Sequence, residues 1–543
     1  MLCKSAWGLC QALRTRNRVR LTLKLLEPPA EVAARIVAVK QVTSLALSGS
    51  FADDDTHLLE SIPDSIGQLA ALKTLKVRGC SFTALPESIG QLAALDVLNI
   101  EHRNGLTALP ESIGQLAALR TLKVETCALT ALLESIGQLA ALEVLNIEDC
   151  NGLTALPESI GQLAALQTLT VTRTALPESI GQLATLQMLT VKICALTALP
   201  ESIGQLAALE VLFIEHCNGL TALPESIGQL AALRMLKVSC ETETLTALPE
   251  SIGQLAALRT LQVFCNGLTV LPDSIGQLTA LETLDIYRSG GVTVLPDSIG
   301  QLAALVTLEV GCCDSLTALP DSIVQLAALK TLAVNECEAL TVLPEGIGQL
   351  AALEGLNIEN CSGLTALPES IGQLAALRTL KVDECQGLTA LPDSIGQLAA
   401  LRTLKVYDCE GLTALPESIG ETATLNDLVI QGVSLTTLPD SISQLAALKT
   451  LGISLCGGLT ALPESIGQLV ALEELNIEYC SGLTALPEGI GRLAALRRLV
   501  VHDCEALTAL PDSISHLPAL QHVDITGTRC TRFNVRGCVI ICR

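Results

Sequence analysis

The chain has 543 residues and a formal net charge of −23, and 49% of its residues are hydrophobic although only 2% are aromatic. This composition predicts a core of Leu, Ile, Val and Ala, built from many small, similar layers and not from one globular core. We expect no nucleic-acid partner, and no stretch is long enough for a membrane span.

Residues 1–41 differ from the rest, with eight basic residues against two acidic ones. Within them, RVRLTLKLL alternates basic or polar residues with Val or Leu from Arg18 to Leu25, which is typical of a strand with one basic and one apolar face. A repeat array needs its exposed end covered, so we expect an N-terminal cap here. An Arg-rich organelle transit peptide is the alternative, because no acid precedes Glu27. No apolar run of secretory-signal length is present.

One phrase then repeats from about residue 42 to residue 526. LPESIGQLAAL stands at residues 85–95 and returns verbatim six more times, with near-copies between. The residue before each Pro-Glu or Pro-Asp pair, or before Leu133-Glu134 in the fourth copy, marks 20 copies, spaced 23 to 25 residues apart with one interval of 20. The markers are Ile62, Leu85, Leu109, Leu132, Leu156, Leu176, Leu199, Leu223, Leu248, Leu271, Leu295, Leu319, Leu343, Leu367, Leu391, Leu415, Leu438, Leu462, Leu486 and Leu510. A fixed period of this length predicts a solenoid, so we interpret 42–526 as one elongated domain, followed by a short basic, Cys-containing tail at 527–543.

Residues 142–163, LEVLNIEDCNGLTALPESIGQL, illustrate one copy. Leu145 and Ile147 alternate with polar residues, which predicts a short strand. Pro157 is expected at the first position of a short helix, where its missing N–H costs nothing. Gly161 is expected to keep that helix short. The sequence therefore predicts one parallel strand and one short helix per copy, hence an α/β fold.

These residues resemble the leucine-rich repeat family over roughly 485 of the 543 residues. The resemblance implies a horseshoe of about 20–21 repeats, with a concave parallel sheet that binds other proteins and short convex helices. The wording LPxSIGxLxxL is similar to intracellular members: Ras-pathway scaffold proteins, their plant Ras-group relatives, and plant disease-resistance receptors, where CxxLxxLP also occurs. It does not resemble the GxIP phrase of secreted plant receptors.

The acidic charge has a local explanation. The position after each repeat proline, or after Leu133 in the fourth copy, is Glu or Asp in all 20 copies, from Asp64 to Asp512. Residues 42–526 carry 54 acidic and 21 basic residues, so these 20 acids supply much of the net charge. A carboxylate is favoured at a helix start, and we interpret these acids as structural charges that also help solubility.

Most of the 21 cysteines recur at one position of the copy, where the strand closes and turns inward. They include Cys127, Cys150, Cys217, Cys313, Cys337, Cys361, Cys385, Cys409, Cys456, Cys480 and Cys504. A row of buried free thiols favours a reducing compartment, and we expect a cytoplasmic protein.

No cysteine has the paired C-x-x-C spacing of a zinc site. This includes Cys312 beside Cys313 and the C-terminal Cys530, Cys538 and Cys542, so we expect no metal.

The sequence has no catalytic motif: no phosphate-binding G-x-x-x-x-G-K-[ST], no kinase set and no G-x-S-x-G. We therefore expect no enzyme, no cofactor and no small-molecule substrate. Three classes remain: a protein-binding scaffold in cytosolic signalling, the ligand-sensing repeats of a disease-resistance-type immune receptor, and the substrate-recruiting part of a ubiquitin ligase. The second class needs a nucleotide-switch domain, which 41 residues before the array cannot hold, and the third needs a catalytic domain after residue 526.

Large side chains at outward strand positions indicate where a partner would bind. Met188, Phe213, Met235, Phe264 and Tyr287 fall on five consecutive predicted strands. Aromatic and Met side chains are enriched in interface hot spots, so we predict one partner-binding patch. The alternative is that these are isolated apolar residues packed on their strand neighbours. Phe82, in contrast, is interpreted as a replacement for a core Leu.

Departures from the phrase carry further information. Copy 16 has Thr422 in place of a core Leu and Val433 at the cysteine position. The copy after Leu156 has lost four residues, and the copy after Leu223 has gained one. These departures either indicate where a partner binds or result from drift and imperfect duplication.

Overall fold

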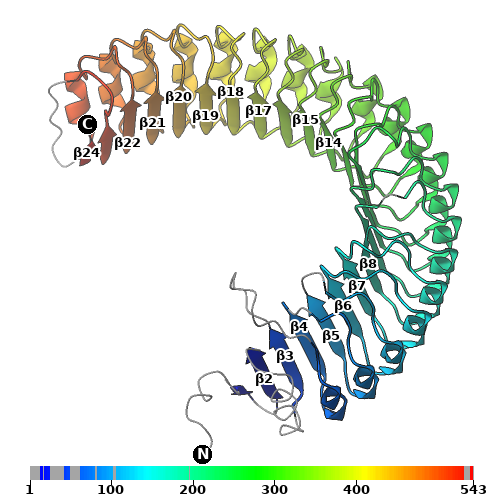
Figure 1. Cartoon of the computed structure of the whole chain (residues 1–543). Helices are drawn as coiled ribbons and strands as arrows, with labels where there is room; N and C mark the ends of the chain where they lie inside the picture. Colours follow the sequence, from blue (N-terminus) through cyan, green and yellow to red (C-terminus); the bar gives the residue numbers. More distant parts are fainter. Residues whose placement is uncertain are drawn as a thin grey trace, which may run out of the picture. The chain divides into compact units, whose positions relative to one another are not determined.

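The computed structural model describes residues 13–15, 18–24, 42–48, 61–79, 82–101, 105–194, 196–530 and 539–541. It divides into two compact units, unit 1 (residues 1–258) and unit 2 (residues 259–543). In each unit, strands lie on one face and short 3-10 helices on the opposite face (Figure 1).

Unit 1 begins with an antiparallel pair, β1 (Leu13–Thr15) and β2 (Arg18–Lys24), and β2 then pairs in parallel with β3. The strand predicted from Arg18 is confirmed, and its role as a cap stays a prediction. The following strands are all parallel to their neighbours: β3 (Ser44–Ser48), β4 (Thr74–Arg78), β5 (Val97–Glu101), β6 (Thr121–Glu125), β7 (Val144–Glu148), β8 (Thr168–Thr172), β9 (Met188–Lys192), β10 (Val211–Glu215) and β11 (Met235–Cys240). The helices are η1 (Asp64–Gln68), η2 (Glu87–Gln91), η3 (Glu111–Gln115), η4 (Glu134–Gln138), η5 (Glu158–Gln162), η6 (Glu178–Gln182), η7 (Glu201–Gln205), η8 (Glu225–Gln229) and η9 (Glu250–Gln254).

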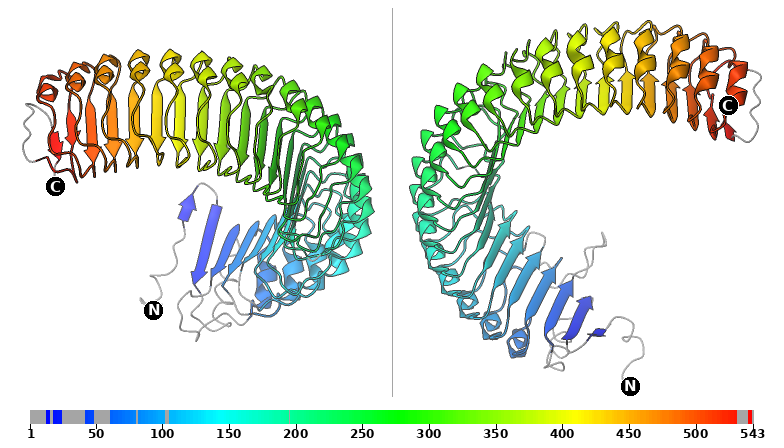
Figure 2. Two further views of the ribbon diagram at one scale, coloured as in Figure 1. Left: turned by 90° about the horizontal axis from the view of Figure 1, so that it is seen from above. Right: turned by 180° about the vertical axis from the view of Figure 1, so that it is seen from behind.

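Unit 2 repeats the pattern (Figure 2). Its strands are β12 (Thr260–Cys265), β13 (Thr283–Tyr287), β14 (Thr307–Gly311), β15 (Thr331–Asn335), β16 (Gly355–Glu359), β17 (Thr379–Asp383), β18 (Thr403–Tyr407), β19 (Asp427–Gln431), β20 (Thr450–Ser454), β21 (Glu474–Glu478), β22 (Arg498–His502), β23 (His522–Asp524) and β24 (Val539–Ile541). Its helices are η10 (Asp273–Gln277), η11 (Asp297–Gln301), η12 (Asp321–Gln325), η13 (Ile347–Gln349), η14 (Glu369–Gln373), η15 (Asp393–Gln397), η16 (Glu417–Glu421), η17 (Asp440–Gln444), η18 (Glu464–Gln468), η19 (Glu488–Arg492) and η20 (Asp512–His516). The last strand, β24, comes from the C-terminal tail and pairs in parallel with β23.

The repeat strands β3 to β23 number 21 within the described part of the chain and alternate with short 3-10 helices, which confirms the predicted leucine-rich repeat solenoid. The predicted place of Pro157 is wrong by one residue. Pro157 is the N-cap of η5, in an extended conformation with φ −70° and ψ 156°, and the helix begins at Glu158. A five-residue 3-10 helix holds little more than one turn, and the extended proline brings the chain from the strand layer into it.

The core is a stack of similar apolar layers. Leu145 and Ile147 of β7 are fully buried, and β7 pairs with β8 so that Leu145 lies beside Leu169 and Ile147 beside Val171. Complete burial of such a side chain contributes about 1.5–3 kcal/mol. Phe82 is 4% exposed, which confirms that it occupies a core position.

Gly161 has a different role from the predicted one. A Cβ at Gly161 would lie 2.5 Å from the backbone oxygen of Ser179 in the next copy, so glycine here permits the close approach of the neighbouring helices. Copy 12 carries Val324 at the equivalent position, and the next copy has Gly346 where most copies have serine. A Cβ at Gly346 would lie 3.1 Å from Val324 Cγ1, and η13 is reduced to three residues, Ile347–Gln349. Glycine at position 346 therefore leaves room for the Val324 side chain.

Changes in copy length are absorbed outside the strands. The copy after Leu156 has 20 residues, against 24 in the preceding copy and 23 in the following one, yet β8 and β9 pair over five residues, from Thr168 beside Met188 onward. The loop after β8 turns early, and the buried Thr174 hydroxyl donates a hydrogen bond to the Thr172 oxygen at 3.0 Å. The β8–β9 ladder across the short loop therefore keeps five pairs, whereas β8 pairs with β7 over four residues.

Candidate protein-binding surfaces

The strand face of each unit is built from alternate residues of consecutive strands. In β7, Val144, Asn146 and Glu148 face outward between the buried Leu145 and Ile147. Because the strands are parallel and in register, equivalent outward residues form rows across neighbouring strands. Two things therefore locate an outward side chain on this face: the strand to which it belongs, and whether it is the first, third or fifth residue of that strand.

Three predicted binding residues lie together on unit 1. Met188 is the first residue of β9, Met235 is the first residue of β11, and Phe213 is the third residue of β10. Val211, the first residue of β10, pairs in register with both methionines. Met188, Val211 and Met235 therefore form one apolar row, with Phe213 in the next outward row; we call these four residues the unit 1 apolar patch.

Sequence reasoning missed Val211 in this patch. Valine occurs at the first strand position of several copies, such as Val97 and Val144, so its residue type alone distinguishes nothing. The strand register, which places Val211 between Met188 and Met235, is the observation that reveals it.

Ion pairs border the patch. Lys192 Nζ lies 3.2 Å from Glu148 Oε2, and Lys237 Nζ lies 2.8 Å from Glu215 Oε1. All four charged side chains are less than one-third exposed, whereas Met188 is 36% exposed. The surface thus has an apolar centre beside a polar, self-neutralised border, the usual arrangement of a protein interface.

The other two predicted residues, Phe264 and Tyr287, lie together on unit 2. They are register partners on β12 and β13, and their rings meet edge to face with centroids 6.2 Å apart. The Tyr287 ring covers Gly311 of β14, where any Cβ would overlap it. The single patch predicted across all five strands stays a prediction, because three members belong to unit 1 and two to unit 2.

Tyr287 is held by polar contacts as well. Its hydroxyl donates a hydrogen bond of 3.0 Å to Glu336 Oε1, and the Cys312 thiol donates one of 2.9 Å to Glu336 Oε2. The hydrogen bond with Cys312, then burial and the Glu336 carboxylate, raise the pKa of Tyr287 above its usual value of 10.0. Burial and the same carboxylate raise the pKa of Cys312. Both groups remain protonated donors at neutral pH, which fixes the Tyr287 ring over the strands.

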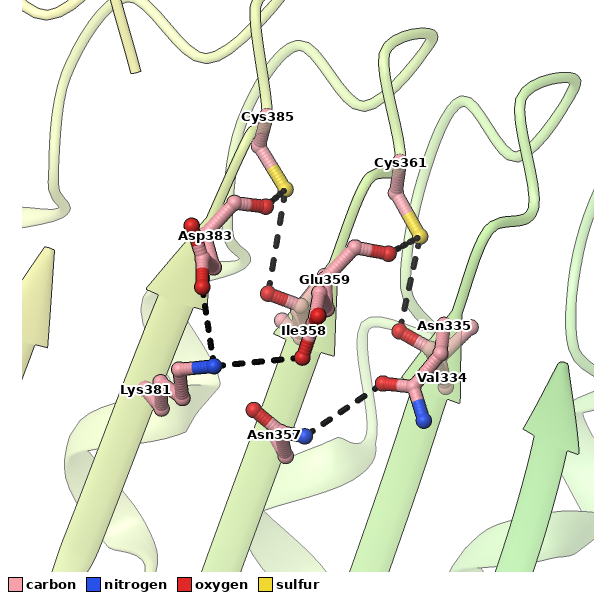
Figure 3. Close-up of polar contacts among 9 residues, drawn as sticks. All are labelled: Val334, Asn335, Asn357, Ile358, Glu359, Cys361, Lys381, Asp383 and Cys385. Atoms are coloured by element: carbon pink, nitrogen blue, oxygen red, sulfur yellow. Dashed lines mark hydrogen bonds and ion pairs between the residues drawn. The ribbon is translucent and has the colours of Figure 1, made fainter. Parts of the chain in front are cut away.

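A second polar network lies further along unit 2 (Figure 3). Lys381 Nζ bridges Glu359 Oε2 at 3.1 Å and Asp383 Oδ2 at 2.8 Å, and lies 5.8 Å from the centre of the Tyr407 ring. Burial alone would lower the pKa of Lys381, but hydrogen bonds with the two carboxylates outweigh it and raise the pKa. This lysine is therefore neutralised by its own neighbours.

The helix-start acids connect consecutive copies, which extends their predicted structural role. Glu158 Oε2, for example, accepts a hydrogen bond of 3.3 Å from the backbone N–H of Ser179 at the start of the next helix. Eight further glutamates do the same for the following copy: Glu87, Glu134, Glu178, Glu201, Glu225, Glu369, Glu417 and Glu464. The donors are among the N–H groups that a helix start leaves without intrahelical acceptors.

The cysteine row performs a similar role on the strand side (Figure 3). Cys361 Sγ donates to the Val334 oxygen of the preceding copy and to the Glu359 oxygen of its own, each at 3.5 Å. All 16 cysteines in the described part of the chain are free, and only Cys312 and Cys530 among them are not buried. The pKa of Cys337 is raised to about 12, first by hydrogen bonding with the Cys313 thiol. The buried thiols are therefore structural donors.

Two negative findings apply to the described residues. No helix there is long and apolar enough to cross a membrane. No group of three or more His, Cys, Asp or Glu side chains is placed to hold a metal ion there. Cys538 and Cys542 lie outside the described residues.

Comparison with known proteins agrees with this architecture. The family model described as "Leucine-rich repeat region" matches residues 54–148, 110–194, 131–244, 284–383 and 356–457, together more than half of the chain. The protein belongs to the leucine-rich repeat family. No curated protein matches its sequence significantly.

Two solved structures are similar over most of the chain. A leucine-rich repeat protein of Leptospira interrogans is 25% identical, with 84% of this chain and 99% of that chain covered and a TM-score of 0.51. A chain of the Drosophila Toll–Spatzle complex is 14% identical, with 94% of this chain and 64% of that chain covered and a TM-score of 0.63. The second likeness concerns the fold alone.

Proposed function

We propose that this protein is a non-catalytic scaffold of intracellular signalling that binds a protein partner on its strand face. The observation that carries the proposal is the unit 1 apolar patch, in which Met188, Val211 and Met235 form a row beside Phe213. In a chain with 2% aromatic residues, these side chains are outward-facing in a fold whose core is complete without them. A leucine-rich repeat array typically binds proteins, and large apolar side chains are common anchors of such contacts.

The cytoplasmic setting is part of the same proposal. Two observations support it: the repeat wording resembles that of Ras-pathway scaffold proteins, and the buried cysteines of the described residues are free thiols. Free thiols in such number are typical of proteins kept in a reducing compartment. Localisation of the tagged full chain by microscopy tests this part, and residence in a secretory or organelle compartment contradicts it.

The binding proposal is tested with the intact protein as bait in proximity labelling, followed by affinity measurement with the purified partner. Phe213→Ala combined with Phe264→Ala should leave thermal stability nearly unchanged and weaken binding by at least about 2 kcal/mol. Single substitutions separate the two units. Charge reversals at Lys381 and at Lys405, its register partner on β18, are the matched control, because they alter a different part of the strand face.

The outcomes separate the alternatives. If binding survives the double substitution and the charge reversals abolish it, the anchor lies further along unit 2 and the proposed site is wrong. If the complete reading frame carries a nucleotide-switch domain upstream or a ligase domain downstream, the scaffold role gives way to a receptor or a ligase role.

A further inference from the structure

A hollow opens on the loop side of unit 2, at the copy that is one residue short. Copy 16 spans 23 residues, and a single residue, Ser434, separates its cysteine-position Val433 from the next core leucine, Leu435. Its neighbours have two residues there, such as Glu410 and Gly411 in copy 15. The shorter loop leaves a cavity of about 430 Å³ between the loops of copies 15 and 17.

The floor of the hollow is held in place by the chain itself. Gly432 has φ +62°, and the Asp408 carboxylate lies so close to it that any Cβ there would overlap Oδ1. The Gly432 N–H donates to the Ser454 oxygen at 2.9 Å, and the Ser434 hydroxyl donates to the Glu410 oxygen at 2.8 Å. The floor is therefore a fixed backbone surface with its own polar groups partly satisfied.

The two walls differ in chemistry. One wall carries the Asp408 and Glu410 side chains, and neither forms an ion pair with any described residue. The opposite wall is formed by Leu455, which is 51% exposed, and by Gly457, where an added Cβ would meet nothing closer than 3.4 Å. An apolar wall opposite two carboxylates matches a long side chain with an aliphatic stem and a cationic head.

The surroundings add charge of the same sign. Asp314, Glu338 and Glu384 occupy loop positions equivalent to Glu410 or Asp408 in copies 11, 12 and 14, and the post-strand loops of copies 11 to 15 contain no Lys or Arg. Equivalent residues of stacked strands lie about 4.8 Å apart per copy. The acidic strip formed by these residues and by Asp408 and Glu410 is thus longer than a single small amine. Its length matches an extended peptide that carries several basic residues.

We propose that this hollow binds an arginine or lysine side chain of an extended basic segment in a partner protein. The stem of that side chain packs against Leu455, its head lies between Asp408 and Glu410, and further basic residues follow the acidic strip. This surface is on the loop side of unit 2 and does not depend on the unit 1 apolar patch.

The test measures binding of a fluorescent peptide of alternating Arg and Gly to the full chain by anisotropy at low ionic strength. The same peptide with citrulline in place of arginine is the neutral control. Asp408→Asn with Glu410→Gln should weaken binding at least tenfold, and Asp314→Asn with Glu338→Gln should weaken it less. Phe213→Ala should have no effect, which separates this proposal from the proposed function.

A second variant distinguishes the hollow from general attraction to acids. Insertion of one glycine between Ser434 and Leu435 restores the usual loop length and fills the hollow while every carboxylate remains. It should also weaken binding at least tenfold, with the circular dichroism spectrum unchanged. Equal binding by the insertion variant and the natural chain, or by the citrulline peptide and the arginine peptide, overturns the proposal. Equally tight binding of free argininamide overturns the assignment to a peptide.

Discussion

Replacement of Gly161 by alanine tests the packing between neighbouring helices. The new Cβ would lie 2.5 Å from the Ser179 backbone oxygen and 3.0 Å from Ser179 Cβ, so η5 and η6 must separate. Overpacking of this kind costs about 1–3 kcal/mol, and the gain in helix propensity offsets about 0.5–1 kcal/mol of it. We expect a net loss of about 1–2 kcal/mol in the free energy of unfolding.

The matched control is Gly355→Ala. Gly355 begins β16, and an added Cβ there meets nothing within 4 Å, so the same chemical change should be neutral or stabilise by about 0.4–1 kcal/mol. Urea unfolding followed by circular dichroism compares the two variants. Hydrogen exchange should quicken at the amides of η5 and η6 in the first variant only, because a solenoid transmits strain to nearest neighbours. Equal unfolding midpoints for the two variants would refute the close-approach argument.

Three further results are expected. Tyr287→Phe removes the hydrogen bond to Glu336 and should lower the free energy of unfolding in urea by about 0.5–1.5 kcal/mol. Because the pKa of Tyr287 in the folded protein is raised above 10.0, the stability that this tyrosine contributes is complete below pH 10 and is lost as the pH rises toward the folded pKa. The difference in stability between the natural chain and the variant should therefore shrink above pH 10. Glu158→Ala should quicken exchange of the Ser179 amide while Glu158→Gln retains most of its protection, and equal exchange in both variants would contradict the inter-copy hydrogen bond. Thiol titration of cytosolically produced protein, denatured without reductant, should find nearly all 21 cysteines free, and several stoichiometric disulfides would contradict the reducing-compartment argument.

The sequence predicted the features that depend on residues close together in the chain. The alternation at Leu145 and Ile147 shows a strand without any knowledge of its neighbours, because side chains of a strand alternate between two faces. The repeat period then predicts that copies stack. A helix of one turn gives too few residues to distinguish 3-10 from α geometry, so the place of Pro157 was wrong by one residue.

Features that depend on contacts between copies could not be predicted in this way. The role of Gly161 is visible only once the Ser179 oxygen of the next copy is in place. Tyr287 and Glu336 are 49 residues apart, and their hydrogen bond crosses an intervening strand that has glycine at the critical position. The predicted anchor residues were chosen by residue type, so Val211 was missed until the register placed it between two methionines.

The shortened copy after Leu156 has a consequence for how such an array can change length. Its strand, β8, keeps five register pairs with β9, so strand pairing across the short loop is complete. Near-identical copies favour unequal recombination between their coding sequences. A crossover inside a loop then joins two copies whose strands can still pair. Arrays that gain or lose whole copies by this route keep a continuous ladder, and the number of copies can vary while each remaining layer packs as before.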